Sequence, residues 1–210
     1  NMMNFIFDNP TKLLFGSDKI KELHTQALPG KKALLLISNG KSTRANGYLD
    51  RVMEQLEMAN VEAVIFDKVM ENPLKEMVME GAAFAKENYC DFIVALGGGA
   101  VLDSSIAISA MATNPGDLWD YVQGGTGNGQ PLQAKGLPVV TIATTSGTGS
   151  EINCWGVISN PETNEKIGFG DPSLTPVLSI VDPKLMLSVP AKYTAYQGFD
   201  ALFHNTEVMI

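Results

Sequence analysis

Short apolar runs alternate with helix-patterned segments along most of this chain. The clearest runs are residues 32–38, 91–96 and 137–143, which are apolar without a polar residue at every second position. A strand that is apolar on both sides is buried on both faces, as in a parallel sheet covered by helices. This pattern therefore predicts an α/β fold with a Rossmann-like parallel sheet and helices on both faces.

The segments between these runs have helical spacing. Residues 48–58 place Leu49, Val52, Met53 and Leu56 on one side, and residues 74–87 repeat the pattern. Residues 100–112 are small and apolar almost all round, which predicts a buried helix. Right-handed crossovers would bring the strand ends and their loops to one edge of the sheet. Further strands are expected at residues 61–66, 152–159 and 177–181, with a hairpin near 160–164.

The last part of the chain changes character. Pro183 and Pro190 interrupt a linker, and a helical pattern then runs from Ala191 to Ile210 without a Gly or Asn cap. We therefore expect a nucleotide-binding α/β domain over residues 1–190. Residues 191–210 would form the first helix of an all-helical domain that is truncated in this sequence.

Composition limits the partners of the chain. The formal net charge of its 210 residues is −8, which argues against nucleic acid and anionic membranes as partners. The two cysteines, Cys90 and Cys154, have no Cys or His neighbour at metal-ligand spacing, and no apolar run is long enough to span a membrane. These features favour a reducing, cytoplasmic location.

Three glycines, Gly97, Gly98 and Gly99, stand between a predicted buried strand and a predicted helix. Glycines let the backbone approach an anion closely, and the start of a helix offers N–H groups to it. The triplet therefore indicates a diphosphate-binding loop, although a tight strand-to-helix turn has the same pattern. Asp103, one turn into the helix, could cap this loop or bind a ribose or nicotinamide amide. It could also be only an acid that the helix dipole stabilises near the N-terminus.

Two other polar loops follow predicted strands. Residues 144–151 are rich in hydroxyls and glycine, which suits a phosphate or amide and equally suits a helix N-cap. Residues 38–42 lie where a dinucleotide site meets the adenosine ribose, and this loop holds no acid that would repel a 2′-phosphate. The loop favours NADP over NAD, unless it is an ordinary entry to a helix.

Asp200 and His204 are spaced i, i+4, so both would project from one face of the last helix. A carboxylate with an imidazole suits a divalent transition metal. The same pair on a solvated helix face needs no metal. His24 lies in an early amphipathic segment and is interpreted as a structural or surface residue.

Five motifs in this order resemble the iron-containing (group III) alcohol dehydrogenase family, in its butanol dehydrogenase-like branch. Residues 9–16 are similar to the opening hairpin of that family, and Asn72-Pro73 to its Asn-Pro. The other three motifs are its glycine loop at 97–103, its T-T-x-G-T-G-S-E at 144–151 and its metal motif G-x-D-A-x-x-H at 198–204.

The resemblance implies hydride transfer between NAD(P)H and a small aldehyde or alcohol. It makes Asp200 and His204 two of four ligands to Fe2+, or to Zn2+, with two histidines outside this chain, so that the chain alone would be inactive. The expected cofactor is NADP, with NAD as the alternative. The residues expected at it are Ser38, Asn39, Gly40, Lys41, Asn72, Gly98, Gly99, Ala100, Asp103, Thr144, Thr145, Thr148 and Lys166.

Two departures from the family pattern bear on cofactor binding. Ala100 replaces a Ser of the phosphate loop, and Ile106 stands where a Lys is common, which would remove a charge near the cofactor. These departures keep a non-catalytic nucleotide-binding paralogue as one alternative, and a related polyol dehydrogenase or dehydroquinate synthase-like enzyme is the alternative within the same fold. The opening strands could pair across a homodimer of the full-length protein.

Overall fold

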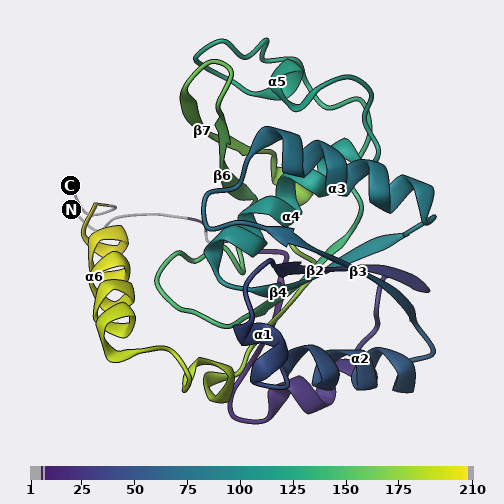
Figure 1. The fold of residues 1–210 in the computed structure, drawn as a ribbon, viewed down its shortest axis with the longest axis vertical. Coiled ribbons are helices and arrows are strands. Elements are labelled where there is room, and N and C mark those ends of the chain that lie inside the picture. The colour runs from purple at the N-terminus through teal and green to yellow at the C-terminus, as the bar shows by residue number, and fades with distance from the viewer. Residues whose placement is uncertain (1–5, 7, 208–210) are drawn as a thin grey trace.

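Six parallel strands form the central sheet of the protein (Figure 1). The computed structural model describes residue 6 and residues 8–207. The strands lie in the order β1–β8–β5–β4–β2–β3, and every neighbouring pair is parallel. Their bounds are β1 (Lys12–Phe15), β2 (Lys32–Ser38), β3 (Glu62–Val69), β4 (Phe92–Gly97), β5 (Val139–Ala143) and β8 (Leu178–Val181).

Helices cover both faces of this sheet, which confirms the predicted fold class (Figure 1). The helices α3 (Lys75–Glu87) and α4 (Gly99–Met111) lie on one face, and α2 (Tyr48–Met58) and the short 3₁₀ helix Lys19–Thr25 lie on the other. The position of β4 inside the sheet, with helices over both faces, explains why its sequence is uniformly apolar. Successive side chains point to opposite faces, so Ile93 joins one hydrophobic cluster and Val94 the other.

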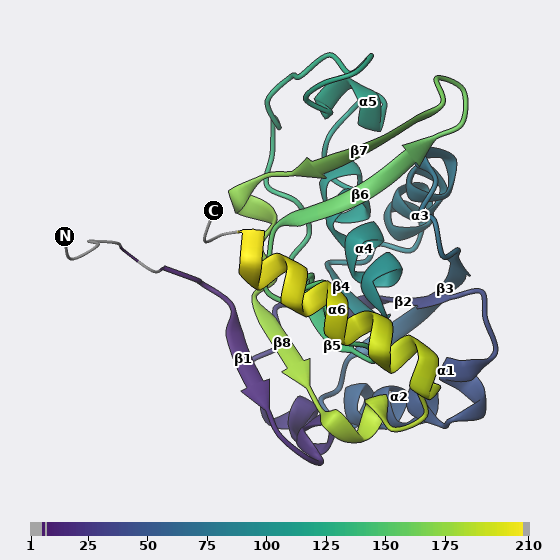
Figure 2. The same cartoon turned by 90° about the vertical axis from the view of Figure 1, so that its left-hand side faces the viewer.

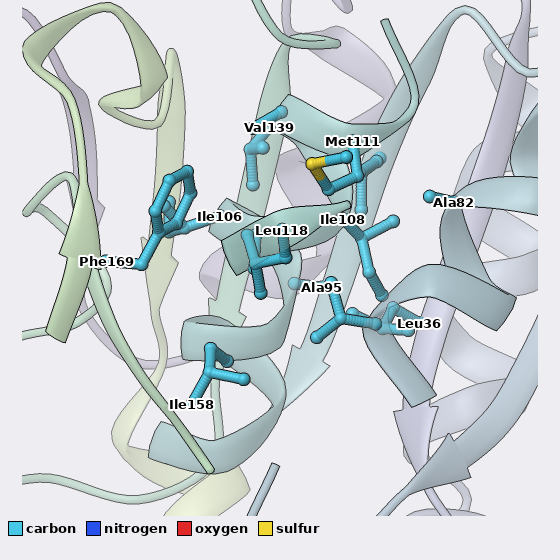
Figure 3. Packing of buried hydrophobic residues seen from close by; sticks show 14 of the residues in the cluster. Leu36, Ala82, Ala95, Ile106, Ile108, Met111, Leu118, Val139, Ile158 and Phe169 are labelled. Atoms are coloured by element: carbon cyan, nitrogen blue, oxygen red, sulfur yellow. The ribbon is translucent and has the colours of Figure 1, made fainter. Parts of the chain in front are cut away.

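An antiparallel hairpin, β6 (Trp155–Asn160) and β7 (Glu165–Gly170), packs against α4 outside the main sheet. Its side chains Ile158 and Phe169 belong to the same buried cluster as α4 (Figure 3). Ile106 of α4 is fully buried in that cluster. The expectation that Ile106 leaves a charge missing beside the cofactor is therefore wrong, because this side chain fills the core.

Some local expectations differ from the structure. Residues 9–16 were expected to resemble an opening hairpin, but within them residues 12–15 form a single edge strand that pairs in parallel with β8. The loop 144–151 runs into turns rather than into a helix. Helix α5 (Leu118–Tyr121), which the sequence did not predict, begins with a capping box formed by Asp117 and Asp120.

Helix α6 (Ala191–Glu207) lies beside the carboxyl ends of the strands rather than on either face of the sheet (Figures 1 and 2). None of its residues is buried, and Phe199 and Phe203 are 63% and 70% exposed. The expected continuation of this helix to Ile210 falls on residues that are not described. Among the described helices, none combines the length and the apolar character needed to cross a membrane.

Short helices complete the connections between these elements. Helix α1 (Ser42–Ala45) follows β2, and 3₁₀ turns cover Pro172–Leu174 and Pro183–Met186 on either side of β8. Each of these two turns begins after an aspartate whose carboxylate accepts a backbone N–H two residues on, as in an N-cap. The segment after β8 is thereby directed across the carboxyl edge of the sheet toward α6.

Candidate functional site

A cavity of about 360 Å³ that opens to solvent lies at the carboxyl ends of the strands. Strand β4 ends at Gly97 and α4 begins at Gly99, so the glycine triplet forms the predicted strand-to-helix turn. The first N–H groups of a helix lack partners within the helix and can bind an anion. The cavity is lined by Ser38, Asn39, Gly40, Ser42, Val69, Met70, Glu71, Gly98, Gly99, Ala100, Val101 and Thr145.

Close contact between two loops explains two of the glycines. A Cβ added at Gly98 would lie 2.9 Å from the Thr145 hydroxyl oxygen, and one at Gly99 would lie 2.9 Å from the Thr148 methyl carbon. Larger residues would push the loop 144–151 away from the start of α4. The glycine loop at residues 97–99 and the Thr-rich loop therefore form one continuous wall, in agreement with the expectation that loops after the strands meet at one edge of the sheet.

A second cavity, of about 370 Å³, adjoins the first. Ser42, Glu71 and Thr145 line both cavities, so these residues mark the junction. The Tyr48 and Ser188 hydroxyl oxygens, 3.0 Å apart, connect α2 to the segment after β8. The remaining lining residues are Thr43, Asn46, Tyr48, Thr144, Leu185, Ser188, Val189, Pro190, Tyr193 and Gln197.

Sequence reasoning missed most of this second cavity. Apart from Glu71, Thr144 and Thr145, its residues come from α1, α2, the segment after β8 and α6, and they carry no local motif. One signal was available, because the segment after the last parallel strand must also begin at the carboxyl edge of the sheet. That rule could have directed attention to residues 182–190.

The structure brings together many of the predicted cofactor residues. Seven of them line the first cavity, and two line the second, with Thr145 counted in both. The first group is Ser38, Asn39, Gly40, Gly98, Gly99, Ala100 and Thr145, and the second is Thr144 and Thr145. The predicted residues that line neither cavity are Lys41, Asn72, Asp103, Thr148 and Lys166.

Asp103 lies behind the glycine loop at residues 97–99 and holds neighbouring segments together. Its carboxylate accepts hydrogen bonds from the Ser150 hydroxyl at 2.8 Å and from the Val157 backbone N–H at 3.0 Å. Burial raises the pKa of Asp103, although these two hydrogen bonds act in the opposite direction. Of the roles expected for this residue, the observed contacts match the capping of a loop.

Lys166 and Asn72 form a second contact between the hairpin and the sheet. The Lys166 ammonium donates to the Asn72 side-chain oxygen at 3.3 Å. The Ser159 N–H donates to the Pro73 carbonyl at 2.8 Å, so the Asn-Pro segment supports the hairpin through its backbone as well. Lys166 therefore connects the hairpin to the segment after β3 and lines neither of the two cavities.

Asp200 and His204 lie on one face of α6, as their spacing predicted. The His204 Nε2 atom is 3.5 Å from the Asp200 Oδ1 atom. The Nδ1 atom of His204 lies 2.8 Å from the Glu207 carboxylate, and this hydrogen bond raises the pKa of the imidazole. A Cβ added at Gly147 would lie 2.9 Å from the Asp200 carboxylate, so the pair lies beside the Thr-rich loop.

The chemistry of Asp200 and His204 fits a divalent transition metal, because oxygen and imidazole nitrogen ligands suit such ions. Within residue 6 and residues 8–207, no three His, Cys, Asp or Glu side chains are grouped to hold a metal ion. The described residues therefore supply a pair of donor groups rather than a closed coordination sphere.

Comparison with known proteins identifies the family. The profile described as iron-containing alcohol dehydrogenase matches residues 10–183. The chain is 41% identical to a probable NADH-dependent butanol dehydrogenase 1 of Bacillus subtilis, over 98% of this chain and 52% of that protein. A choline dehydrogenase of Bacillus subtilis is 39% identical, over 96% of this chain and 50% of that protein.

Solved structures agree with this assignment. The NADH-dependent butanol dehydrogenase A of Thermotoga maritima superposes with a TM-score of 0.88 and 34% sequence identity. That superposition covers 97% of this chain and 50% of the other, so the chain spans about half the length of the relatives that it matches. Fold, motif order and profile agree: the chain belongs to the iron-containing alcohol dehydrogenase family.

Proposed function

We propose that this chain is the cofactor-binding part of a metal-dependent oxidoreductase that transfers hydride between NAD(P)H and a small aldehyde or alcohol. The observation that carries the proposal is the cavity at Gly98, Gly99 and Ala100, which lies at the carboxyl edge of a parallel sheet. Dinucleotides bind at this edge in open α/β sheets, with the diphosphate at a helix N-terminus.

The two adjoining cavities suggest how the cofactor lies. The diphosphate would rest on the backbone at the start of α4, and the adenosine would enter the second cavity near Tyr48 and Leu185. Ser38, Asn39, Gly40, Thr144 and Thr145 would contact the cofactor directly. Asp103, Thr148, Asn72 and Lys166 would position the surrounding loops, and Lys41 would act from outside the cavity.

Asp200 and His204 would supply two ligands to a divalent metal, Fe2+ or Zn2+. A bound metal of this kind acts as a Lewis acid toward a substrate oxygen. The chain itself contributes the arrangement of the two side chains on one helix face and their place beside the Thr-rich loop. Because two ligands do not complete a site of four, we expect weak metal binding and no turnover by this chain alone.

Several wider features are part of the same proposal. Residues 1–190 would form the nucleotide-binding domain, and 191–210 would begin the helical metal-binding domain. The full-length protein would act in the cytoplasm as a homodimer, for which the edge strand β1 offers exposed side chains at Leu13 and Phe15. These statements extend the family assignment to the whole protein.

Calorimetric titration of the chain with ADP-ribose tests the phosphate site. Ala100→Asp places a carboxylate beside the proposed diphosphate, where it repels the ligand but suits the positive end of the α4 dipole. We expect ADP-ribose binding to be lost while the melting temperature is kept. Ala83→Asp on the exposed side of α3 is the control, because it adds the same charge elsewhere. Equal affinity in both variants would exclude the proposed diphosphate position.

A further inference from the structure

Glu71 is the charged residue of the two cavities. All other side chains that line them are apolar, hydroxyl, amide or glycine positions in the described part of the chain. Lys41, the cation of the loop 38–42, lines neither cavity. The charge presented to a ligand in this space is therefore negative, in contrast to what the loop 38–42 suggests by itself.

The position of Glu71 is set by the end of β3. This strand ends at Val69, whose carbonyl accepts a hydrogen bond from the Asn39 N–H at 2.8 Å. The contact joins the loop after β2 to the segment that carries Glu71. Among the described residues, none donates a hydrogen bond to the Glu71 carboxylate or forms an ion pair with it. The carboxylate is exposed and available to a ligand.

Glu71 lines both cavities and so lies at their junction, with Ser42 and Thr145. A dinucleotide with its diphosphate at Gly98 and its adenine in the second cavity must pass its adenosine ribose through this junction. A carboxylate there accepts a hydrogen bond from a ribose hydroxyl and repels a 2′-phosphate. We infer that Glu71 makes the site selective for NAD(H) over NADP(H).

This inference rests on the proposed cofactor site, and it changes the expected cofactor. The loop 38–42 favoured NADP because it holds no acid, but the acid comes from the segment after the neighbouring strand β3 instead of the segment after β2. Strand β3 is adjacent to β2 in the sheet, so its end reaches the same ligand position from the side. A discriminating acid can therefore be absent from the usual loop and still be present in the site.

The size of the effect follows from Coulomb repulsion. A phosphate monoester carries about −1.5 to −2 charges at neutral pH. At a separation of about 5 Å in an environment close to water, its repulsion by one carboxylate corresponds to about tenfold in affinity. We use the aqueous limit because Glu71 is exposed, and we expect high salt to reduce the effect.

Titration of the chain with ADP-ribose, NAD+ and NADP+ at low and high salt tests the inference. The unmodified chain should bind NAD+ at least about tenfold more tightly than NADP+. Glu71→Gln should remove most of this preference, and Glu71→Lys should reverse it. Glu57→Gln is the matched control, because it removes the same charge near the end of α2, at the opposite edge of the sheet, and should leave the ratio unchanged.

The outcomes separate the two proposals. If ADP-ribose binds but the NAD+ to NADP+ ratio is the same in the unmodified chain, Glu71→Gln and Glu71→Lys, then the cofactor site stands and the role of Glu71 is wrong. Tighter binding of NADP+ by the unmodified chain would also overturn the inference. If none of the three ligands binds the correctly folded chain, both the cofactor site and the selectivity are refuted.

Discussion

The contact between Gly156 of β6 and the backbone of α4 allows a sharp test of how the hairpin is held. A Cβ added at Gly156 would lie 2.5 Å from the Asp103 carbonyl oxygen and 2.9 Å from the Asp103 Cα. Neither atom can rotate away, and α4 is packed in the core. Gly156→Ala must therefore move the hairpin outward.

The cost of this movement has identifiable parts. Overpacking against a fixed backbone costs about 1–3 kcal/mol. Outward movement also stretches the hydrogen bond from the Val157 N–H to the Asp103 carboxylate, and such bonds to charged groups contribute about 1.5–3 kcal/mol. Replacing Gly by Ala restricts the unfolded chain and offsets about 0.4–1 kcal/mol. We expect a net loss of about 2–4 kcal/mol in the free energy of unfolding.

Urea denaturation of Gly156→Ala and Gly168→Ala measures this loss directly. Gly168 lies across the hairpin from Val157, and a Cβ there would meet no heavy atom closer than the Trp155 ring at 4.0 Å. The control should therefore be neutral or slightly more stable. If the two variants unfold at the same urea concentration with the same slope, the tight packing between Gly156 and α4 does not exist.

Two further predictions concern single side chains. Glu165 accepts hydrogen bonds from Thr126, Thr163 and Trp119, which lower its pKa from 4.5 to about 2. The resulting stability is present above pH 4.5 and is lost as the pH falls through about 2. Melting temperatures measured from pH 6 to 2 should fall less steeply for Glu165→Gln, and parallel curves would contradict this. Ala100→Ser adds a hydroxyl beside the proposed diphosphate and should strengthen ADP-ribose binding, by about tenfold at most. Calorimetry that finds no gain would show that position 100 does not face the ligand.

The elements that the sequence predicted best are those with strong local patterns. The helix over residues 48–58 agrees at both ends, and the strand over 32–38 does as well. Both patterns are set by which face is buried, and this is visible in the spacing of apolar residues. The order of the strands in the sheet is set by packing between distant segments, which the spacing does not record.

The candidate site shows the same division. Gly98, Gly99 and Thr145 were predictable because a glycine triplet and a Thr-rich run are local signals at strand ends. Glu71 had no such signal, since its position depends on the pairing of β2 with β3. Ile106 was misinterpreted for a different reason. The apolar pattern of residues 100–112 predicted a buried helix, and the structure confirms it, but the family pattern led us to expect a charge at this position.

The division of β4 between two hydrophobic clusters has a consequence for folding. Because Ile93 and Val94 are neighbours in the chain and pack into different layers, neither layer can melt while the other keeps this strand in place. The phosphate loop begins where that strand ends, so a local opening that exposes the loop without disturbing either layer is hard to achieve. We therefore expect the turn at residues 97–99 to open only together with the two layers that hold β4.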